Sequence, residues 1–250
     1  MFGLGLVDAV SDDSLEQIAA AQKRSAPHIA GEVHWVRDVA SDKVRAGRFG
    51  WKSQVATLMT FSGDAYLNEM GITTPMFPNE NPPGGDASQL AKCDTVADPE
   101  DDGTAVENFA NFMSSLAPPP RGRITSLVDA GERLFERLGC ATCHLPTMTT
   151  GPHRTAALDR VTFHPFSDFL LHDMGDLGDG IEQGRANGRE MRTAPLWGLS
   201  VRNTFLHDGR ATTLEAAILG HDGQGDDARQ RYKHLSPDES AKLIAFLKSL

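Results

Sequence analysis

Cysteine is scarce in this sequence, with three residues among 250. That number is far too small for a fold built on disulfides, whereas 40% hydrophobic residues are enough for a buried core. Two of the three, Cys140 and Cys143, are three positions apart, and Cys93 stands alone in an acidic segment. The number of cysteines does not identify the cellular compartment, so that has to be inferred from the chemistry of the residues around the cysteine pair.

Aromatic residues and positive charge are also in short supply. Only 7% of the residues are aromatic, beside 24 glycines and 14 prolines, which predicts many turns and long connections between short regular elements. The net charge is −10 and the isoelectric point is near 5.3. Such a field repels phosphate backbones and anionic lipid surfaces, so nucleic acid is not an expected partner, and it attracts a basic redox partner.

The sequence also lacks long apolar runs. No segment is apolar over the length that a bilayer requires, so no membrane span is expected. The first residues, "MFGLGLVDAVSDDSLEQ", have neither the basic start nor the sustained apolar stretch of a signal peptide, and acidic residues begin at Asp8.

Helix signals divide the chain into two regions, residues 1–122 and 123–250, separated by the proline-rich connector "APPPRGR". The first region is expected to be rich in loops and partly helical. Its clearest helix is "SDDSLEQIAAAQKR", in which Ser11 is the N-cap, acidic residues fill the first turn and basic residues close the last. Residues 79–104 are polar and acidic, which predicts a solvated loop.

Two amphipathic helices bracket the second region, so the predicted fold class is mainly α. The first, in "SLVDAGERLFERLG", ends at Gly139 just before Cys140. The last has Ser236 as N-cap, Pro237 at its first position and Glu239 completing a capping box. Between them lie many loops, glycines and histidines, and a core of this kind usually needs something else to pack around.

The segment "GCATCHLP", residues 139–146, has the spacing of a c-type haem attachment site. Two thiols three positions apart can reach the two vinyl groups of one porphyrin, and His144 directly after the second thiol becomes the proximal iron ligand. A zinc site needs four ligands, and the only further cysteine is Cys93. A redox dithiol needs a helix that begins at the pair, whereas here a helix ends there. Covalent haem is the favoured interpretation.

A low-spin haem needs a second axial ligand from a distant part of the chain. Met191, in "GREMRTAPLWGLSVRN", is far enough along the chain to reach the face opposite His144 and is the predicted ligand. Met174 and His207 are the main alternatives, and core packing is the ordinary role of a methionine. The remaining histidines, His221 among them, show no pattern that predicts a ligand.

Several polar residues are candidates for the surroundings of the haem. His172 and His207 are each followed by an aspartate, which indicates that they orient turns or meet a haem propionate. Arg192 and Arg202 could neutralise propionates, because a guanidinium pairs with a carboxylate through two hydrogen bonds. Alternatively, each of the two arginines is an exposed residue without such a role.

Four stretches together resemble the C-terminal haem domain of bacterial di-haem cytochrome c peroxidases. They are "GERLFERLGCATCHLP", "FSDFLLHDMG", "MRTAPLWGLSVRNTFLHDGRATTLEAAILGH" and "LSPDESAKLIAFLKSL". With "GLGLVDAV", "GRFGWK" and "GITTPMFP" from the first region, the similarity is to the branch of di-haem oxidoreductases labelled thiol oxidoreductase-like. It covers nearly the whole chain and is strongest from about residue 125 onwards.

The resemblance implies two c-type haems in two cytochrome c-like domains, one reacting with peroxide or another oxidant and one passing electrons. It also implies Met191 as distal ligand, since the peroxidases place a methionine before an xxxP stretch and "MRTAP" matches it. In the closer branch an aromatic residue often stands there. A calcium ion between the haem domains is implied as well, without ligands that can be assigned here, together with a small cytochrome or cupredoxin as redox partner.

This chain departs from that pattern in two ways. Residues 1–139 contain no CxxCH, so one covalent haem c is expected rather than two. The signal peptide needed for periplasmic haem attachment is absent too. We therefore expect the C-terminal portion of a longer periplasmic protein, in which residues 1–122 are the incomplete N-terminal region and residues 123–250 the cytochrome c-like domain.

The predicted function is electron transfer by the C-terminal haem domain of a di-haem oxidoreductase or peroxidase. Two axial ligands leave no open iron site for peroxide, so enzymatic turnover is expected only when an N-terminal haem domain is supplied. The alternatives are a self-contained mono-haem electron carrier and a single-haem peroxidase with an open coordination position.

Overall fold

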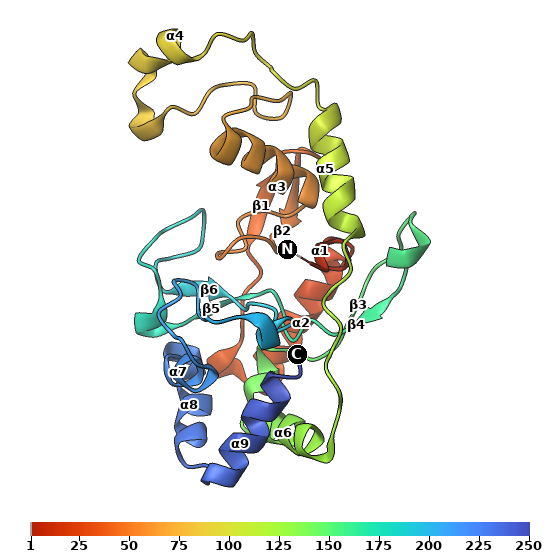
Figure 1. Ribbon diagram of the computed structural model, residues 1–250, viewed down its shortest axis with the longest axis vertical. Helices are drawn as coiled ribbons and strands as arrows, with labels where there is room; N and C mark the ends of the chain where they lie inside the picture. Colours follow the sequence, from red (N-terminus) through yellow and green to blue (C-terminus); the bar gives the residue numbers. More distant parts are fainter. Residues whose placement is uncertain (1) are drawn as a thin grey trace.

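The computed structural model describes residues 2–250 and confirms a mainly α architecture (Figure 1). Its α-helices are α1 (Leu4–Asp8), α2 (Asp12–Ser25), α3 (Leu58–Ala65), α4 (Leu90–Cys93), α5 (Thr104–Ser115), α6 (Ser126–Arg137), α7 (Leu214–Leu219), α8 (Asp226–Lys233) and α9 (Pro237–Leu247). Three separate antiparallel pairs form from β1 (Trp35–Asp38) and β2 (Lys43–Ala46), β3 (Met148–Thr149) and β4 (Thr162–Phe163), and β5 (Leu171–Asp173) and β6 (Glu190–Arg192). Within the described residues, every helix is too short or too polar to cross a membrane.

Local signals explain where the longer helices begin. At α2 the Ser11 hydroxyl accepts a hydrogen bond from the Ser14 backbone N–H at 3.1 Å. At α9 the Ser236 hydroxyl accepts from the Glu239 N–H, and the Glu239 carboxylate accepts from the Ser236 N–H, which completes the predicted capping box. Residues 79–104, where a solvated loop is expected, also contain α4 and short 3₁₀ turns. Each of these is a single hydrogen-bonded turn, for which four residues suffice.

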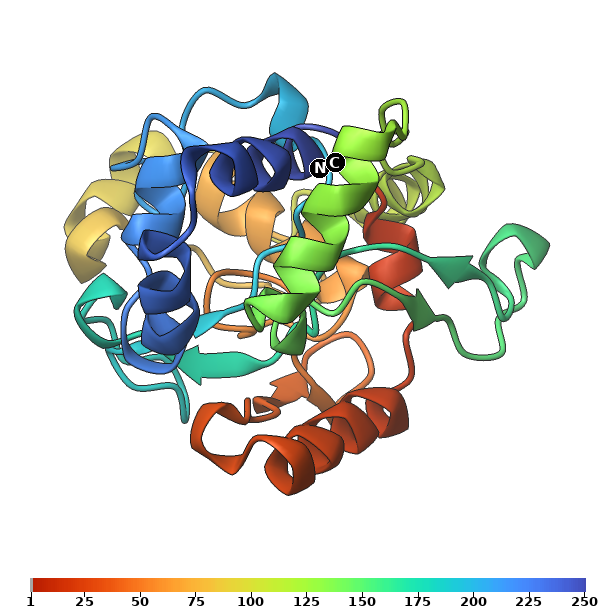
Figure 2. The ribbon, with the colours of Figure 1, turned by 90° about the horizontal axis from the view of Figure 1, so that it is seen from below.

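The C-terminal core forms where α6 packs across α9 (Figure 2). The two helices approach so closely that a Cβ atom on Gly131 would lie 2.0 Å from the backbone oxygen of Lys242. Phe135 and Phe246 meet in this interface with ring centres 5.2 Å apart, and Phe166 joins them from the loop between β4 and β5. The predicted bracketing helices therefore pack directly on one another.

A second core cluster joins both halves of the sequence. It combines residues of the first region, such as Val10 and Leu58, with Phe169, Leu170 and Trp197 from the second. The division at residue 122 remains a prediction. The two stretches share one apolar core, so the first region supports the second.

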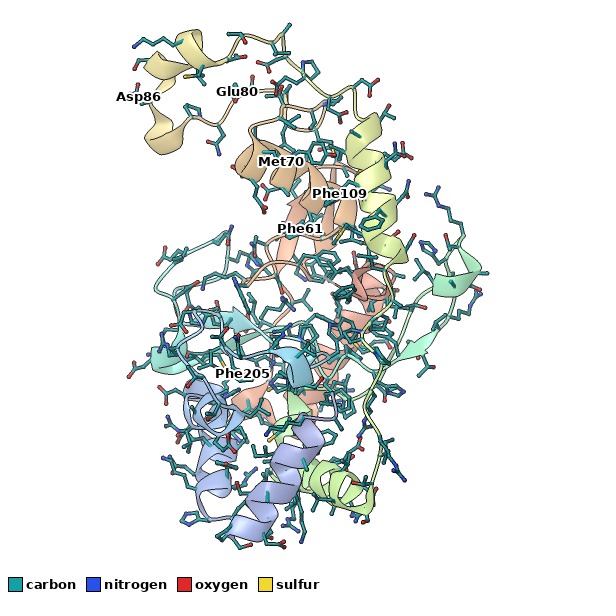
Figure 3. All side chains as sticks on the ribbon, viewed as in Figure 1. Phe61, Met70, Glu80, Asp86, Phe109 and Phe205 are labelled. Carbon is teal, nitrogen blue, oxygen red and sulfur yellow. The ribbon has the colours of Figure 1, made fainter. Side chains whose placement is uncertain are left out.

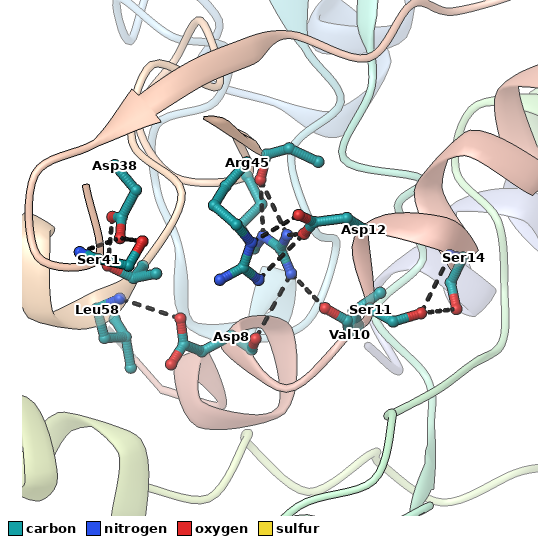
Figure 4. Close-up of polar contacts among 12 residues, drawn as sticks. Asp8, Val10, Ser11, Asp12, Ser14, Asp38, Ser41, Arg45 and Leu58 are labelled. Atoms are coloured by element: carbon teal, nitrogen blue, oxygen red, sulfur yellow. Dashed lines mark hydrogen bonds and ion pairs between the residues drawn. The ribbon is translucent and has the colours of Figure 1, made fainter. Parts of the chain in front are cut away.

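A buried polar cluster fixes α2 against β2 (Figure 4). The Arg48 guanidinium donates to the backbone oxygens of Ala46 and Val10 and to the Asp12 carboxylate. Arg45 donates to the same carboxylate at 2.6 Å from the partly exposed side. Asp12 follows the N-cap of α2, so this cluster sets the position of that helix.

The acidic segment lies far from the α6 and α9 pair. In Figure 3, Glu80 and Asp86 mark its place at one end of the molecule, and Phe205 lies toward the other end. The carboxylates of Glu80, Asp98 and Glu100 come within 4.8 Å of one another in this segment. Exposed acidic groups often gather without an ion, so the cluster does not identify a calcium site.

Candidate functional site

One cavity of about 410 Å³ brings the sequence-predicted site residues together. Its size lies within the range of ligand and cofactor pockets, about 300–1,000 Å³. It is lined by Cys140, Cys143, His144, His172, Met191, Arg192 and His207. Most of the remaining wall is apolar and includes Phe135 from α6, Leu214 from α7, and Leu243 and Leu247 from α9. The cavity therefore suits a large, mainly apolar molecule.

The two thiols of the CxxCH segment are free and lie on the cavity wall. Gly139, with φ of 88°, ends α6 in the left-handed conformation that favours glycine. The chain then forms a single 3₁₀ turn, η5 (Cys140–Thr142). Cys140 and Cys143 form no disulfide, and burial raises the pKa of the Cys140 thiol to about 12. Neither sulfur is therefore bonded to another cysteine.

His144 is held as a neutral imidazole. Its Nδ1–H donates to the backbone oxygen of Phe166 at 3.0 Å, since a carbonyl oxygen can only accept. Burial, followed by the neighbouring His221, lowers the pKa of His144 to about 4. The Nε2 lone pair is therefore free at neutral pH, which is the state that a metal-binding imidazole requires.

His221 faces His144 and was not predicted from the sequence. Their ring centres are 6.3 Å apart, and His221 lies two residues after the end of α7. Its Nδ1–H donates to the backbone oxygen of Ala217 at 2.8 Å, and burial lowers its pKa. The sequence feature that could have indicated His221 is its position just after a helix, where free backbone carbonyl groups can orient an imidazole ring.

A buried ion pair stands beside Cys143. His172 Nε2 lies 2.9 Å from the Asp168 carboxylate, and its Nδ1 lies 2.9 Å from Gln224 Oε1 and 3.5 Å from Cys143 Sγ. Burial alone would lower the pKa of His172, but the charge and hydrogen bond of Asp168 outweigh it and raise the pKa well above its usual value. His172 thus adjoins a thiol of the CxxCH segment.

The first region contributes directly to this site through α2. The Gln22 amide donates to the Asp168 carboxylate at 2.7 Å and to the backbone oxygen of Thr142 at 2.8 Å. Its own oxygen accepts from the Gly31 N–H at 2.8 Å. Gln22 therefore supports both the buried ion pair and the turn that contains the cysteines, a role that the sequence did not predict.

Met191 lies on β6 directly opposite His172 on β5. Its sulfur lies 3.8 Å from the Lys52 ammonium group, which is buried and also pairs with Asp179 at 2.7 Å. Lys52 further donates to the backbone oxygen of Glu190 at 2.8 Å. Met191 thus lines the cavity while its sulfur contacts the Lys52 ammonium group.

His207 and the two predicted arginines occupy different parts of the wall. The His207 ring lies 6.2 Å from that of Trp51, in an edge-on arrangement. Arg202 is exposed, whereas the Arg192 guanidinium donates to the backbone oxygens of Gly50 at 2.6 Å and Thr193 at 3.2 Å. Of the two arginines, Arg192 is the one that is partly buried and held by backbone oxygens.

Comparison with solved structures finds distant likenesses. The hydrazine synthase of Kuenenia stuttgartiensis is 20% identical, with a TM-score of 0.43 over 65% of this chain and 60% of the other, so the chain spans less than two thirds of that protein. A MauG-like protein associated with microbial copper homeostasis is 16% identical, with a TM-score of 0.44 over 96% of this chain and 89% of the other. Neither likeness carries an argument about function. No curated protein matches the sequence significantly.

The family comparison covers the entire chain. Residues 1–250 match the family described as "Di-haem oxidoreductase, putative peroxidase". The resemblance expected from the sequence motifs is thereby confirmed, and with it a redox function linked to haem. This protein belongs to the di-haem oxidoreductase family.

Proposed function

We propose that the cavity binds one haem c, attached through Cys140 and Cys143 with His144 as proximal ligand, and that residues 123–250 act as a cytochrome c-like electron-transfer domain. The observation that carries the proposal is a neutral His144, oriented by the Phe166 carbonyl, on the wall of an apolar cavity beside two free thiols. When bound, the haem supplies one-electron chemistry. The chain supplies the bonds, the ligand nitrogens and a wall that excludes water.

For the second axial ligand, the geometry favours His221 over the sequence-predicted Met191. Two imidazoles that share one metal ion have ring centres about 6 Å apart, because each metal–nitrogen bond is about 2 Å long. The rings of His144 and His221 have this separation, and the Nδ1–H of each ring already donates a hydrogen bond to a backbone carbonyl. The Met191 sulfur instead contacts the Lys52 ammonium. We therefore include His221 in the proposed site and keep Met191 as its competitor.

The proposed role is electron transfer rather than peroxide turnover, because two axial ligands leave the iron without an open position. Turnover then requires a second haem domain of the kind that the family has. A small cytochrome or cupredoxin is the proposed redox partner, with the periplasm as location because haem c is attached there. A calcium ion is left out of this proposal.

Spectra of the covalently loaded protein test the site. The full chain is expressed with a secretion signal and a haem-maturation system, as wild type and as His221→Ala, Met191→Ala and Cys140→Ala/Cys143→Ala. We expect a low-spin wild type, a high-spin His221→Ala and an unchanged Met191→Ala. The reverse result for the two single variants would assign the ligand to Met191, and a high-spin wild type would favour the single-haem peroxidase. A wild type without haem after denaturation would refute the haem c proposal.

A further inference from the structure

Arg192 lies partly buried on the wall of the cavity and has an incomplete set of hydrogen-bond partners. Its Nε and Nη1 donate to the backbone oxygens of Gly50 and Thr193, and its guanidinium lies 5.8 Å from the centre of the Phe169 ring. Within residues 2–250, no hydrogen bond involves Nη2, although Arg192 lines the cavity. The guanidinium therefore has donor capacity left for a molecule in the cavity.

The charge of Arg192 is also unbalanced. No carboxylate of the described residues lies within 4.0 Å of it. Asp168 is the acid whose charge acts on Arg192, but its oxygens already accept hydrogen bonds from His172, Gln22 and the Leu170 N–H.

Two fully buried cations among the described residues, Arg48 and Lys52, show what Arg192 lacks. Arg48 pairs with Asp12, and Lys52 pairs with Asp179 at 2.7 Å. Removing a charge from water without a partner is costly, so an occupant of the cavity that covers the Arg192 guanidinium is expected to bring its own anion. A planar guanidinium suits a carboxylate, which can accept two parallel hydrogen bonds.

We propose that Arg192 binds a carboxylate of the molecule that occupies the cavity. This inference rests on the proposed function, under which the carboxylate is a haem propionate. Because Arg192 is held by Gly50, the same contact joins the segment before Trp51 to the bound haem. The propionate would then be bound at the junction of the two sequence regions rather than at the protein surface.

A binding cycle with haem and its dimethyl ester tests this contact, since the ester lacks the propionate charges. The full chain carries Cys140→Ala and Cys143→Ala, so that binding is reversible, and affinities are measured by titration of the Soret band. In this background Arg192→Gln should weaken haem binding about ten- to hundredfold, the range of a charge-assisted hydrogen bond, and leave ester binding nearly unchanged. Arg192→Lys should restore part of the affinity for haem. Arg189→Gln, which removes a charge from the exposed side of the same hairpin, is the control.

The outcomes separate this inference from the proposed function. Equal losses for haem and ester in Arg192→Gln, or equal losses in the Arg189→Gln control, would overturn the carboxylate contact while haem binding stands. If no variant and no wild-type chain binds haem, the proposed function fails and the inference with it. If Arg192→Gln does not fold, the comparison uses Arg192→Lys, which keeps the charge but not the planar set of donors. An Arg192→Lys chain that loses no affinity for haem relative to the chain with Arg192 then overturns the guanidinium contact.

Discussion

Replacing Arg48 with methionine should lower the free energy of unfolding by about 3–5 kcal/mol. Methionine retains much of the aliphatic packing and removes the guanidinium, which is fully buried between α2 and β2. The change matters for the site because α2 also carries Gln22, which reaches the turn that contains the cysteines.

The magnitude follows from the groups that lose their donor. The Ala46 backbone oxygen accepts from Arg48 at 2.9 and 3.1 Å, and the Val10 oxygen accepts from Nη1. Leaving a buried acceptor unpaired costs about 1–3 kcal/mol. Asp12 retains Arg45 as a partner, so its charge is not left alone and the total stays in the range for one broken buried pair, about 3–5 kcal/mol.

Arg45→Met is the matched control, because it removes the same chemical group from the same carboxylate. The Arg45 side chain is 32% exposed, and its loss should cost at most about 1 kcal/mol. Urea unfolding of the two variants and the wild type, with equal m-values, measures both costs. If the two substitutions destabilise the chain equally, the assignment of the cost to burial of Arg48 is wrong.

Two further predictions concern packing and protonation. Gly131→Ala should destabilise the chain by about 1–3 kcal/mol in the same urea assay, because its Cβ would meet the Lys242 backbone oxygen at 2.0 Å. Gly63→Ala should cost less, because its Cβ would meet side chains that can shift, the flexible end of Met76 at 2.7 Å and the Phe77 ring at 3.1 Å. A similar cost at both positions would contradict the packing argument. In the haem-free protein, burial lowers the pKa of His144 to about 4 from its ordinary value of about 6.5. As the pH falls, the unfolded chain therefore binds this proton before the folded chain does. The folded state should lose about 3 kcal/mol of stability from this residue between pH 6.5 and pH 4. His144→Gln should remove that part of the pH dependence in urea titrations at pH 7 and pH 4, and an unchanged slope would refute the assignment.

Features that depend on neighbouring residues could be predicted from the sequence. The caps at Ser11 and Ser236 form where expected, because an N-cap contacts backbone groups only two or three residues away. The CxxCH segment is of the same kind, since two thiols and one imidazole lie within five residues. The predicted mainly α class followed from these helix signals, and the family comparison confirms the resemblance on which the function was based.

Tertiary structure alone decided which distant residues complete the site. Gln22 and Asp168 are separated by 146 positions, and nothing in the local sequence of either indicates the other. The same holds for His221 opposite His144, and for Lys52 beside the sulfur of Met191, whose role as ligand remains a prediction. The proposed haem attachment was thus predicted from one short segment, because its residues are neighbours in the sequence. The proposed second ligand, His221, and the proposed contact of Arg192 depend on which distant segments meet at the cavity.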